Sequence, residues 1–209
     1  MKDRYDDIDE YIADLKDEIG KNEQCATHHY NLGVALLSKR DFVAAEEALL
    51  EAVRNSPNLA EAYVQLGGIC QDRGDLEGCL RYNEEAANCR PKFSVAWSNI
   101  AFVHVQRNDP DKALDAVDKA LKWDPGFIQA MNVKAVALYM KGEYEKTEEL
   151  CMAILNKEPH FAPAWMNLAL ACFEREDFGK AVQAADKAQE LGYDVPEAFM
   201  EELRPHRGA

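Results

Sequence analysis

Three groups of residues in this sequence are of types that carry chemistry: the triplet Arg73-Gly74-Asp75, the pair His28-His29, and six cysteines. Arg-Gly-Asp on an exposed loop has the form of a cell-adhesion ligand. Cysteine and histidine are the ligands that zinc prefers, but no two cysteines form a C-x-x-C pair and the histidine pair has no companion cluster. We therefore expect no structural metal site. The cysteines are Cys25, Cys70, Cys79, Cys89, Cys151 and Cys172.

Composition excludes several classes of partner. The chain has 209 residues, 47% of them apolar, and a formal net charge of −14. Such a charge repels nucleic-acid phosphates and anionic lipid headgroups, so we expect neither as a partner. Acidic residues recur throughout the N-terminal stretch MKDRYDDIDEYIADLKDEIG, which argues against a secretory signal, and no apolar run is long enough to span a membrane. We expect a cytoplasmic protein without a disulfide framework.

An active site is not expected either. The glycines stand singly rather than in a phosphate-binding loop, and no spacing suggests a Ser/His/Asp or Cys/His set. The many Asp and Glu residues fall on predicted helix surfaces, where solvation is the simplest explanation. The sequence predicts a protein that is not an enzyme and binds no cofactor.

A regular period organises the chain, because Pro57, Pro91, Pro125 and Pro159 are evenly spaced. Five blocks keep this period without insertion or deletion. They begin at Ala26, Ala60, Ser94, Ile128 and Ala162. The fourth position of each block is mostly large (His29, Tyr63, Trp97, Met131, Trp165), and the eighth is always small (Gly33, Gly67, Ala101, Ala135, Ala169).

This pattern resembles the tetratricopeptide repeat, in which each 34-residue unit is a hairpin of two helices. Lys134 stands where the pattern has Leu, and Tyr193 where it has Pro. The resemblance implies an all-α fold, a right-handed α-solenoid with an extra N-terminal helix and a C-terminal capping helix. The expected segments are an incomplete leading repeat (1–25), five repeats (26–59, 60–93, 94–127, 128–161, 162–193), and a capping helix with a tail (194–209).

The physical pattern agrees with this resemblance. Apolar residues recur at helical spacing, as in Tyr30, Val34 and Leu37. Small residues at position 8 let the two helices of a hairpin approach closely. A single hairpin cannot bury its apolar faces, so each repeat needs its neighbours.

In this family, binding usually takes place in the concave groove lined by the first helix of each hairpin. Asparagine and glutamine at position 6 can both donate to and accept from a peptide backbone. Apolar residues at positions 5, 9 and 12 predict a surface that is exposed in a monomer, unless the side chains cover one another or the terminal helix fills the groove. The expected partner-binding residues are Tyr30, Asn31, Val34, Leu37, Gln65, Asn99, Phe102, Val105, Asn132, Val136, Tyr139, Met166, Asn167, Leu170 and Phe173.

The resemblance implies a non-catalytic adaptor or scaffold that binds a peptide or helix of another protein. The acidic charge favours basic or neutral partner segments. Positions 2 and 5 lack Lys and Arg, so the carboxylate clamp of the family's cochaperones is not expected. Three alternatives stay open: a self-assembling scaffold that forms a homo-oligomer; a cytosolic chaperone for exported subunits; and a regulatory subunit of an enzyme encoded elsewhere.

The repeat register also assigns repeat positions to the cysteines and to the Arg-Gly-Asp triplet. Cys70, Cys79, Cys151 and Cys172 fall at interior positions, where free cysteine packs as a small hydrophobe; a redox role for Cys70 and Cys79 is the minority alternative. Arg73-Gly74-Asp75 falls at positions 14 to 16, the turn between two helices. All five blocks place a base and, two residues later, an acid there. The residue between them is Gly or Asn in three blocks, which suits a left-handed turn, and Arg or Glu in the other two. We therefore interpret the triplet as a turn rather than an adhesion ligand.

Overall fold

All regular secondary structure in the part of the chain that the structure describes is helical. The computed structural model describes residues 7–207, and these contain twelve α-helices, one short 3-10 helix and no strand. Residues 1–6 of the leading segment and residues 208–209 of the tail lie outside the described residues. The prediction of an all-α fold is confirmed. The elements are α1 (Ile8–Lys21), α2 (Ala26–Ser38), α3 (Phe42–Asn55), α4 (Ala60–Asp72), α5 (Leu76–Cys89), α6 (Ser94–Gln106), α7 (Pro110–Trp123), α8 (Ile128–Met140), α9 (Tyr144–Lys157), α10 (Ala162–Glu174), α11 (Phe178–Glu190), α12 (Glu197–Leu203) and η1 (Arg204–His206).

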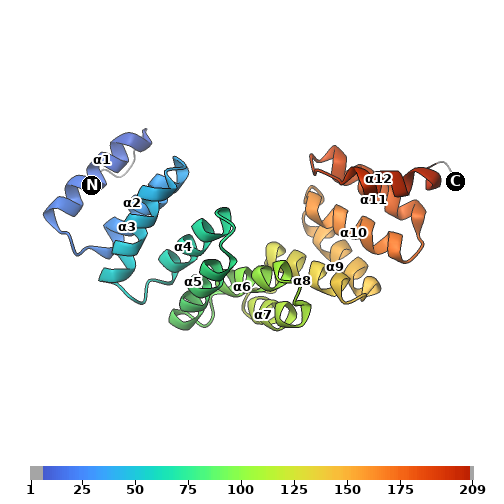
Figure 1. The fold of residues 1–209 in the computed structure, drawn as a ribbon, viewed down its shortest axis with the longest axis horizontal. Helices are drawn as coiled ribbons and strands as arrows, with labels where there is room; N and C mark the ends of the chain where they lie inside the picture. The colour runs from blue at the N-terminus through green and yellow to red at the C-terminus, as the bar shows by residue number, and fades with distance from the viewer. Residues whose placement is uncertain (1–6, 208–209) are drawn as a thin grey trace. The chain divides into compact units, whose positions relative to one another are not determined.

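The helices follow the period of the sequence. A helix begins at each of the five predicted block starts, and a second helix follows each of them after a short turn. The chain divides into two compact units, Met1–Ile100 and Ala101–Ala209, whose boundary falls within α6. Within each unit, neighbouring helices pack as hairpins (Figure 1).

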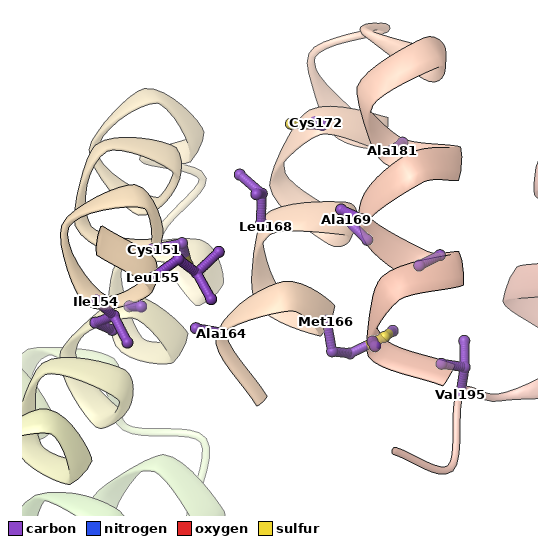
Figure 2. Close-up of a cluster of buried hydrophobic side chains, with 14 of the residues drawn as sticks. Cys151, Ile154, Leu155, Ala164, Met166, Leu168, Ala169, Cys172, Ala181 and Val195 are labelled. Carbon is purple, nitrogen blue, oxygen red and sulfur yellow. The ribbon is translucent and has the colours of Figure 1, made fainter. Parts of the chain in front are cut away.

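Each unit has its own apolar core. In unit 1 the core gathers side chains of α1 to α4, with Leu15, Leu49 and Leu66 fully buried. In unit 2 one cluster runs from α8 to the C-terminal helix, and its α9 residues Cys151 and Leu155 face α10 (Figure 2). None of the helices within residues 7–207 combines the length and apolarity that crossing a bilayer requires.

The small residue at position 8 sets how closely the two helices of a hairpin approach. A Cβ added to Gly33 would lie 2.6 Å from Leu49 Cγ, and one added to Gly67 would lie 2.4 Å from Asn83 Nδ2. Real Cβ atoms essentially never come that close. Both opposing side chains occupy position 24 of the same block, so positions 8 and 24 share one space between the helices.

Position 4 carries a recurring hydrogen bond. Trp97 Nε1 donates to the carbonyl oxygen of Pro91 at 2.9 Å, and Trp165 Nε1 donates to that of Pro159 at 2.8 Å. His29 Nε2 makes the equivalent bond to Glu23 O at 2.8 Å. Glu23 is the residue that replaces proline in the incomplete leading repeat, so that segment follows the same geometry as the complete ones. Each of these bonds ties a first helix to the link that precedes it.

The turn between the two helices requires a left-handed residue in every block. The φ angle at position 15 is positive in all five turns: Arg40 61°, Gly74 74°, Asn108 56°, Gly142 75° and Glu176 61°. The prediction of a left-handed turn is confirmed. A side chain on a left-handed residue crowds the following carbonyl, so the two turns built on Arg and Glu carry strain that glycine avoids.

This strain predicts the effect of substitutions at position 15. Arg40→Gly and Glu176→Gly are each expected to raise the free energy of unfolding by about 0.5–1 kcal/mol, because relief of the left-handed strain exceeds the entropy that glycine adds to the unfolded chain. Urea denaturation followed by circular dichroism measures the change. Gly74→Ala is the matched control and is expected to shift stability in the opposite direction. A loss of stability in both glycine variants would contradict the prediction.

The base at position 14 of several turns pairs with an acid of the preceding repeat. Lys141 pairs with Asp111 at 2.5 Å, and Arg175 pairs with Glu145 at 3.0 Å, both in unit 2. Lys39 pairs with Asp9 in the same way in unit 1. These pairs are solvent-exposed, so each contributes only about 0–1 kcal/mol. They nevertheless add a repeated contact between successive repeats.

The C-terminal segment closes unit 2 as a cap. Helix α12 buries Phe199 and Leu203, and the Phe199 ring meets Phe173 edge-to-face with centroids 5.4 Å apart. Beyond α12, the His206 ring stacks on Phe178 at 3.7 Å. Arg207 donates to Asp186 of α11 through both terminal nitrogens. The terminal segment is therefore docked on unit 2 through α12, His206 and Arg207.

Candidate protein-binding faces

The predicted site residues of unit 1 lie on the first helices of its hairpins. We call them the N-terminal groove face: Tyr30, Asn31, Val34 and Leu37 on α2, Gln65 on α4, and Asn99 on α6. Val34 is exposed (38%), and the other five side chains are half-buried. Tyr30, Val34 and Leu37 follow one stripe of α2, as their helical spacing predicts.

A recess of about 370 Å³ opens at the end of this face. It is bordered by Leu37 of α2 and Phe42 at the start of α3, and by Gln65, Gly68 and Asp72 of α4. A Cβ added to Gly68 would meet no atom within 4 Å, so the missing side chain leaves open space. The sequence analysis did not single out Gly68, although the other blocks carry Val, Phe or Leu at this position.

The predicted site residues of unit 2 form a second surface. We call it the C-terminal groove face: Phe102 and Val105 on α6, Asn132, Val136 and Tyr139 on α8, and Asn167, Leu170 and Phe173 on α10. All eight side chains are half-buried.

Charge is nearly absent from the two helices that carry most of this face. Helix α8 has one charged residue, Lys134, and its ammonium pairs with Asp118 of α7 at 2.7 Å. Helix α10 has one, Glu174, at its last position. Low charge is shared by other first helices, since α2 and α6 carry no Asp, Glu, Lys or Arg, in a chain that is 30% charged.

Two polar contacts join α8 and α10 across this face. Asn167 Nδ2 donates to Asn132 Oδ1 at 2.9 Å, and the Tyr139 hydroxyl donates to Glu174 Oε1 at 3.1 Å. Burial, followed by the neighbouring Glu174 carboxylate, raises the pKa of Tyr139 to about 12. The phenol therefore keeps its proton at neutral pH and acts here as a donor.

Met166 differs from the expectation of an open surface. Its side chain is only 5% exposed and belongs to the same apolar cluster as Val195 and Phe199 (Figure 2). The C-terminal segment covers it, and Phe199 also packs on Phe173. The terminal helix therefore fills one end of the groove face, which was the competing interpretation of the apolar residues. The remaining residues of both faces are placed together within their units, and their role in binding stays a prediction.

The sequence analysis missed Asn83, the one fully buried asparagine among residues 7–207. Its Nδ2 donates to the Cys79 carbonyl at 2.8 Å, and its Oδ1 accepts from Asn99 Nδ2 at 2.9 Å. Position 24 holds Leu49, Val117, Cys151 or Ala185 in the other blocks. A polar residue at this otherwise apolar position was the available signal.

The structure shows the environment of the cysteine thiols. All six cysteines are free thiols, and burial raises the pKa of Cys151 to about 12 and that of Cys79 to about 11. Such thiols are poor nucleophiles at neutral pH.

Arg73 pairs with Glu46 of the preceding hairpin at 2.6 Å, and Asp75 caps α5 by accepting from Gly78 N at 2.9 Å. The charged ends of the triplet are thus engaged within the protein.

Comparison with known proteins decides the family. The family model for the tetratricopeptide repeat matches residues 11–67, 100–155 and 152–196, which is more than half of the chain. The chain belongs to the tetratricopeptide repeat family. Proteins of this family are generally non-catalytic repeat adaptors, so membership supports a protein-interaction scaffold.

Individual relatives are distant. General transcription factor 3C polypeptide 3 of Homo sapiens is 26% identical over 151 residues, covering 68% of this chain and 17% of that protein. The chain spans less than half the length of the first curated relatives that it matches. Among solved structures, pilF of Pseudomonas aeruginosa superposes with a TM-score of 0.80 at 17% identity, covering 96% of this chain and 90% of that one. YrrB, described as a tetratricopeptide repeat protein with an unusual peptide-binding site, gives 0.72 at 18% identity, with 91% and 97% covered.

These similarities confirm the predicted repeat fold and the family. They leave the repeat boundaries, the cytoplasmic location and the partner as predictions.

Proposed function

We propose that this tetratricopeptide repeat protein is a non-catalytic scaffold whose C-terminal groove face binds an apolar, uncharged segment of another protein. The observation that carries the proposal is the half-buried apolar surface of α8 and α10, whose only charged residues are Lys134, paired with Asp118, and the terminal Glu174, in a chain with a net charge of −14. Val136 and Leu170 of this face are half-buried, as is Val133, which lies at position 6 on α8. An apolar partner segment would remove their remaining exposed surface from water.

The protein's own C-terminal segment supports the same interpretation. Phe199 of α12 packs on Phe173 at one end of the face, so this surface accepts an aromatic side chain from a short helix. The partner segment would continue over the part of the face that α12 leaves half-exposed. The amides of Asn132 and Asn167 supply polar contacts beside the apolar ones. YrrB is a protein of the same fold with a peptide-binding site, which is consistent with a related use of the fold here.

Charge placed on this face tests the proposal. Val133→Glu combined with Val136→Glu is expected to reduce recovery of partner proteins at least about tenfold, since a carboxylate buried in an apolar contact without a cation is costly. The measurement is affinity purification from the native host followed by quantitative mass spectrometry. Far-ultraviolet circular dichroism checks that the variant remains helical.

A matched control adds the same charge elsewhere. Met152→Glu with Gln183→Glu places two carboxylates on exposed positions of α9 and α11, outside the groove face. Recovery by this variant should equal that of the natural protein. Equal recovery by all three proteins would contradict a binding role for the C-terminal groove face.

A further inference from the structure

A pocket of about 550 Å³ opens between α1, α2 and α3 of unit 1. Its apolar wall includes Ile19 of α1, Leu32 of α2 and Leu50 of α3, and His29 of α2 is a polar member of the wall. Pockets that bind small molecules have volumes of about 300–1,000 Å³ and mostly apolar walls with a few polar groups. None of the predicted groove residues lines this pocket, so it is separate from both groove faces.

His29 stands at the repeat position where two other blocks carry tryptophan. Its Nε2 lies 2.8 Å from the carbonyl oxygen of Glu23, and Trp97 Nε1 donates to that of Pro91 at 2.9 Å. Trp165 makes the same bond, in each case to the carbonyl six residues earlier. The backbone position and the bonded nitrogen together orient a five-membered ring. The imidazole of His29 therefore takes the place of the five-membered ring of the tryptophans.

The second ring of tryptophan has no counterpart in His29. In tryptophan the six-membered ring is fused to the edge that corresponds to Cε1 and Nδ1 of histidine. Trp165 packs with its complete ring system on the apolar cluster of unit 2. At His29 the corresponding space borders the pocket, because Nε2 faces the preceding link and His29 is part of the pocket wall. An apolar cavity of ring size can bind a free benzene ring.

The Nδ1 atom of His29 adds a hydrogen-bond acceptor at this place. The Glu23 carbonyl oxygen can only accept, so Nε2 carries the proton, and in the neutral imidazole Nδ1 is then an acceptor. Among the described residues Nδ1 has no hydrogen-bond partner, although His29 is only 8% exposed. A ligand in the pocket therefore gains a hydrogen bond if it carries a donor beside its ring.

The charges that line the pocket favour an uncharged ligand. Lys16 and Arg54 are cationic, Glu47 and Glu51 are anionic, and Arg54 pairs with Glu51. Because the two signs cancel, an ionised ligand gains no net attraction from them. These charged side chains lie on α1 and α3, at the border of the apolar wall. The border favours a small ligand over a protein surface, which needs a contact area of about 800 Å² per partner.

We propose that the pocket beside His29 binds a small uncharged phenol. Its hydroxyl donates to His29 Nδ1, and its ring lies beyond the imidazole among the apolar side chains of the wall. Phenol is a small ring with one strong donor, so it matches the acceptor and the space together. This binding site goes beyond the scaffold function, because it involves neither groove face.

Two ligands of similar size test the proposal in the natural protein. Fluorobenzene has the ring of phenol and no donor. Each is titrated into the full chain in mildly alkaline buffer, which favours neutral imidazole, while nuclear magnetic resonance follows the His29 ring and Ile19 methyl signals. Phenol should saturate with a dissociation constant on the order of 1 mM, as expected for so small a ligand. It should bind about fivefold more tightly than fluorobenzene, the factor expected for one hydrogen bond.

Two tryptophan variants locate the site. His29→Trp supplies the second ring and should lower the affinity for phenol at least about tenfold, because two rings cannot share one space. The variant is expected to fold, since Trp97 and Trp165 occupy the same repeat position. Tyr63→Trp is the matched control at this position of the next block, and it should bind phenol as the natural protein does. The Ile19 methyl signals report binding in all three proteins.

The results that would overturn the proposal are specific. They are the lack of a saturable shift at His29 and Ile19, equal affinity for phenol and fluorobenzene, and undiminished affinity in His29→Trp. The comparison of the two ligands needs no variant, so it decides the proposal even if His29→Trp fails to fold.

Discussion

Phe199→Ala is expected to undock the C-terminal cap and remove about 3 kcal/mol from its binding to the rest of unit 2. The Phe199 side chain is 8% exposed and joins the main cluster of unit 2. Truncation of buried phenylalanine costs about 3–5 kcal/mol, and the lower end applies because the ring lies at the edge of the unit and the terminal segment relaxes easily. A helix of seven residues has little stability of its own, so loss of its anchor should melt it.

Hydrogen exchange measured by mass spectrometry locates the effect. Residues 197–206 should lose their protection in Phe199→Ala, while α8 and α9 keep theirs, because stability in repeat proteins depends on nearest neighbours. Glu201→Ala is the control in the same helix: it is exposed, and its pair with Arg204 contributes within about 0.5 kcal/mol. Undiminished protection of α12 in Phe199→Ala would show that Phe199 does not anchor the cap.

The same variant probes the groove face. Phe199 contacts Phe173 and shares an apolar cluster with Met166, so its truncation uncovers apolar surface at one end of the C-terminal groove face. An apolar partner segment should then be retained at least as well as by the natural protein. Circular dichroism at several protein concentrations separates this effect from aggregation of the uncovered surface.

Gly33→Ala is expected to lower the free energy of unfolding by about 2 kcal/mol, although alanine is the better helix former. The new Cβ would lie 2.6 Å from Leu49 Cγ and 3.3 Å from the Ala45 carbonyl oxygen. Overpacking of a tight core costs about 1–3 kcal/mol and can exceed it against backbone, whereas the gain in helix propensity is at most about 1 kcal/mol. Urea denaturation of the full chain measures the difference.

A second substitution should rescue the first. Where position 8 is alanine, position 24 is smaller than leucine, as in the Ala101–Val117 pair. Leu49→Val alone is expected to cost about 1 kcal/mol, and Gly33→Ala with Leu49→Val should cost less than the sum of the two single changes. The double-mutant cycle gives this coupling directly. Strict additivity would show that the two positions do not share one space.

Helix positions and turns were predictable from the sequence because they depend on local properties. Each second helix starts after a base, a left-handed residue and an acid, and four of the acids cap their helix by accepting from the backbone N–H three residues on. Glu143 has no such bond, since its longer side chain does not place the carboxylate at the cap. The regular spacing of proline and of small residues predicted the helical hairpins, and the structure has hairpins at those places.

The sequence predicted the repeat position of each groove residue, but it did not predict which of these residues are exposed. Asn31, Gln65 and Asn99 share a repeat position, yet only the fold shows that Asn99 is held by a buried neighbour on the preceding helix. Met166 has the same repeat position as Tyr30 and is nevertheless buried. The difference lies in the segment that covers each residue: the C-terminal helix packs over Met166, whereas the exposed Val34 lies near Tyr30 on α2.

Spacing and local backbone preferences, both readable in the sequence, were sufficient to establish the all-α repeat class, the hairpins, their turns and the residue at each repeat position. Packing of the helices established which apolar positions remain half-exposed, which amides bind one another, and that the terminal helix closes one end of the C-terminal groove face. Those outcomes depend on contacts between side chains that are far apart in the sequence. Whether the sizes and hydrogen-bonding groups of these side chains match is decided only when the helices pack together.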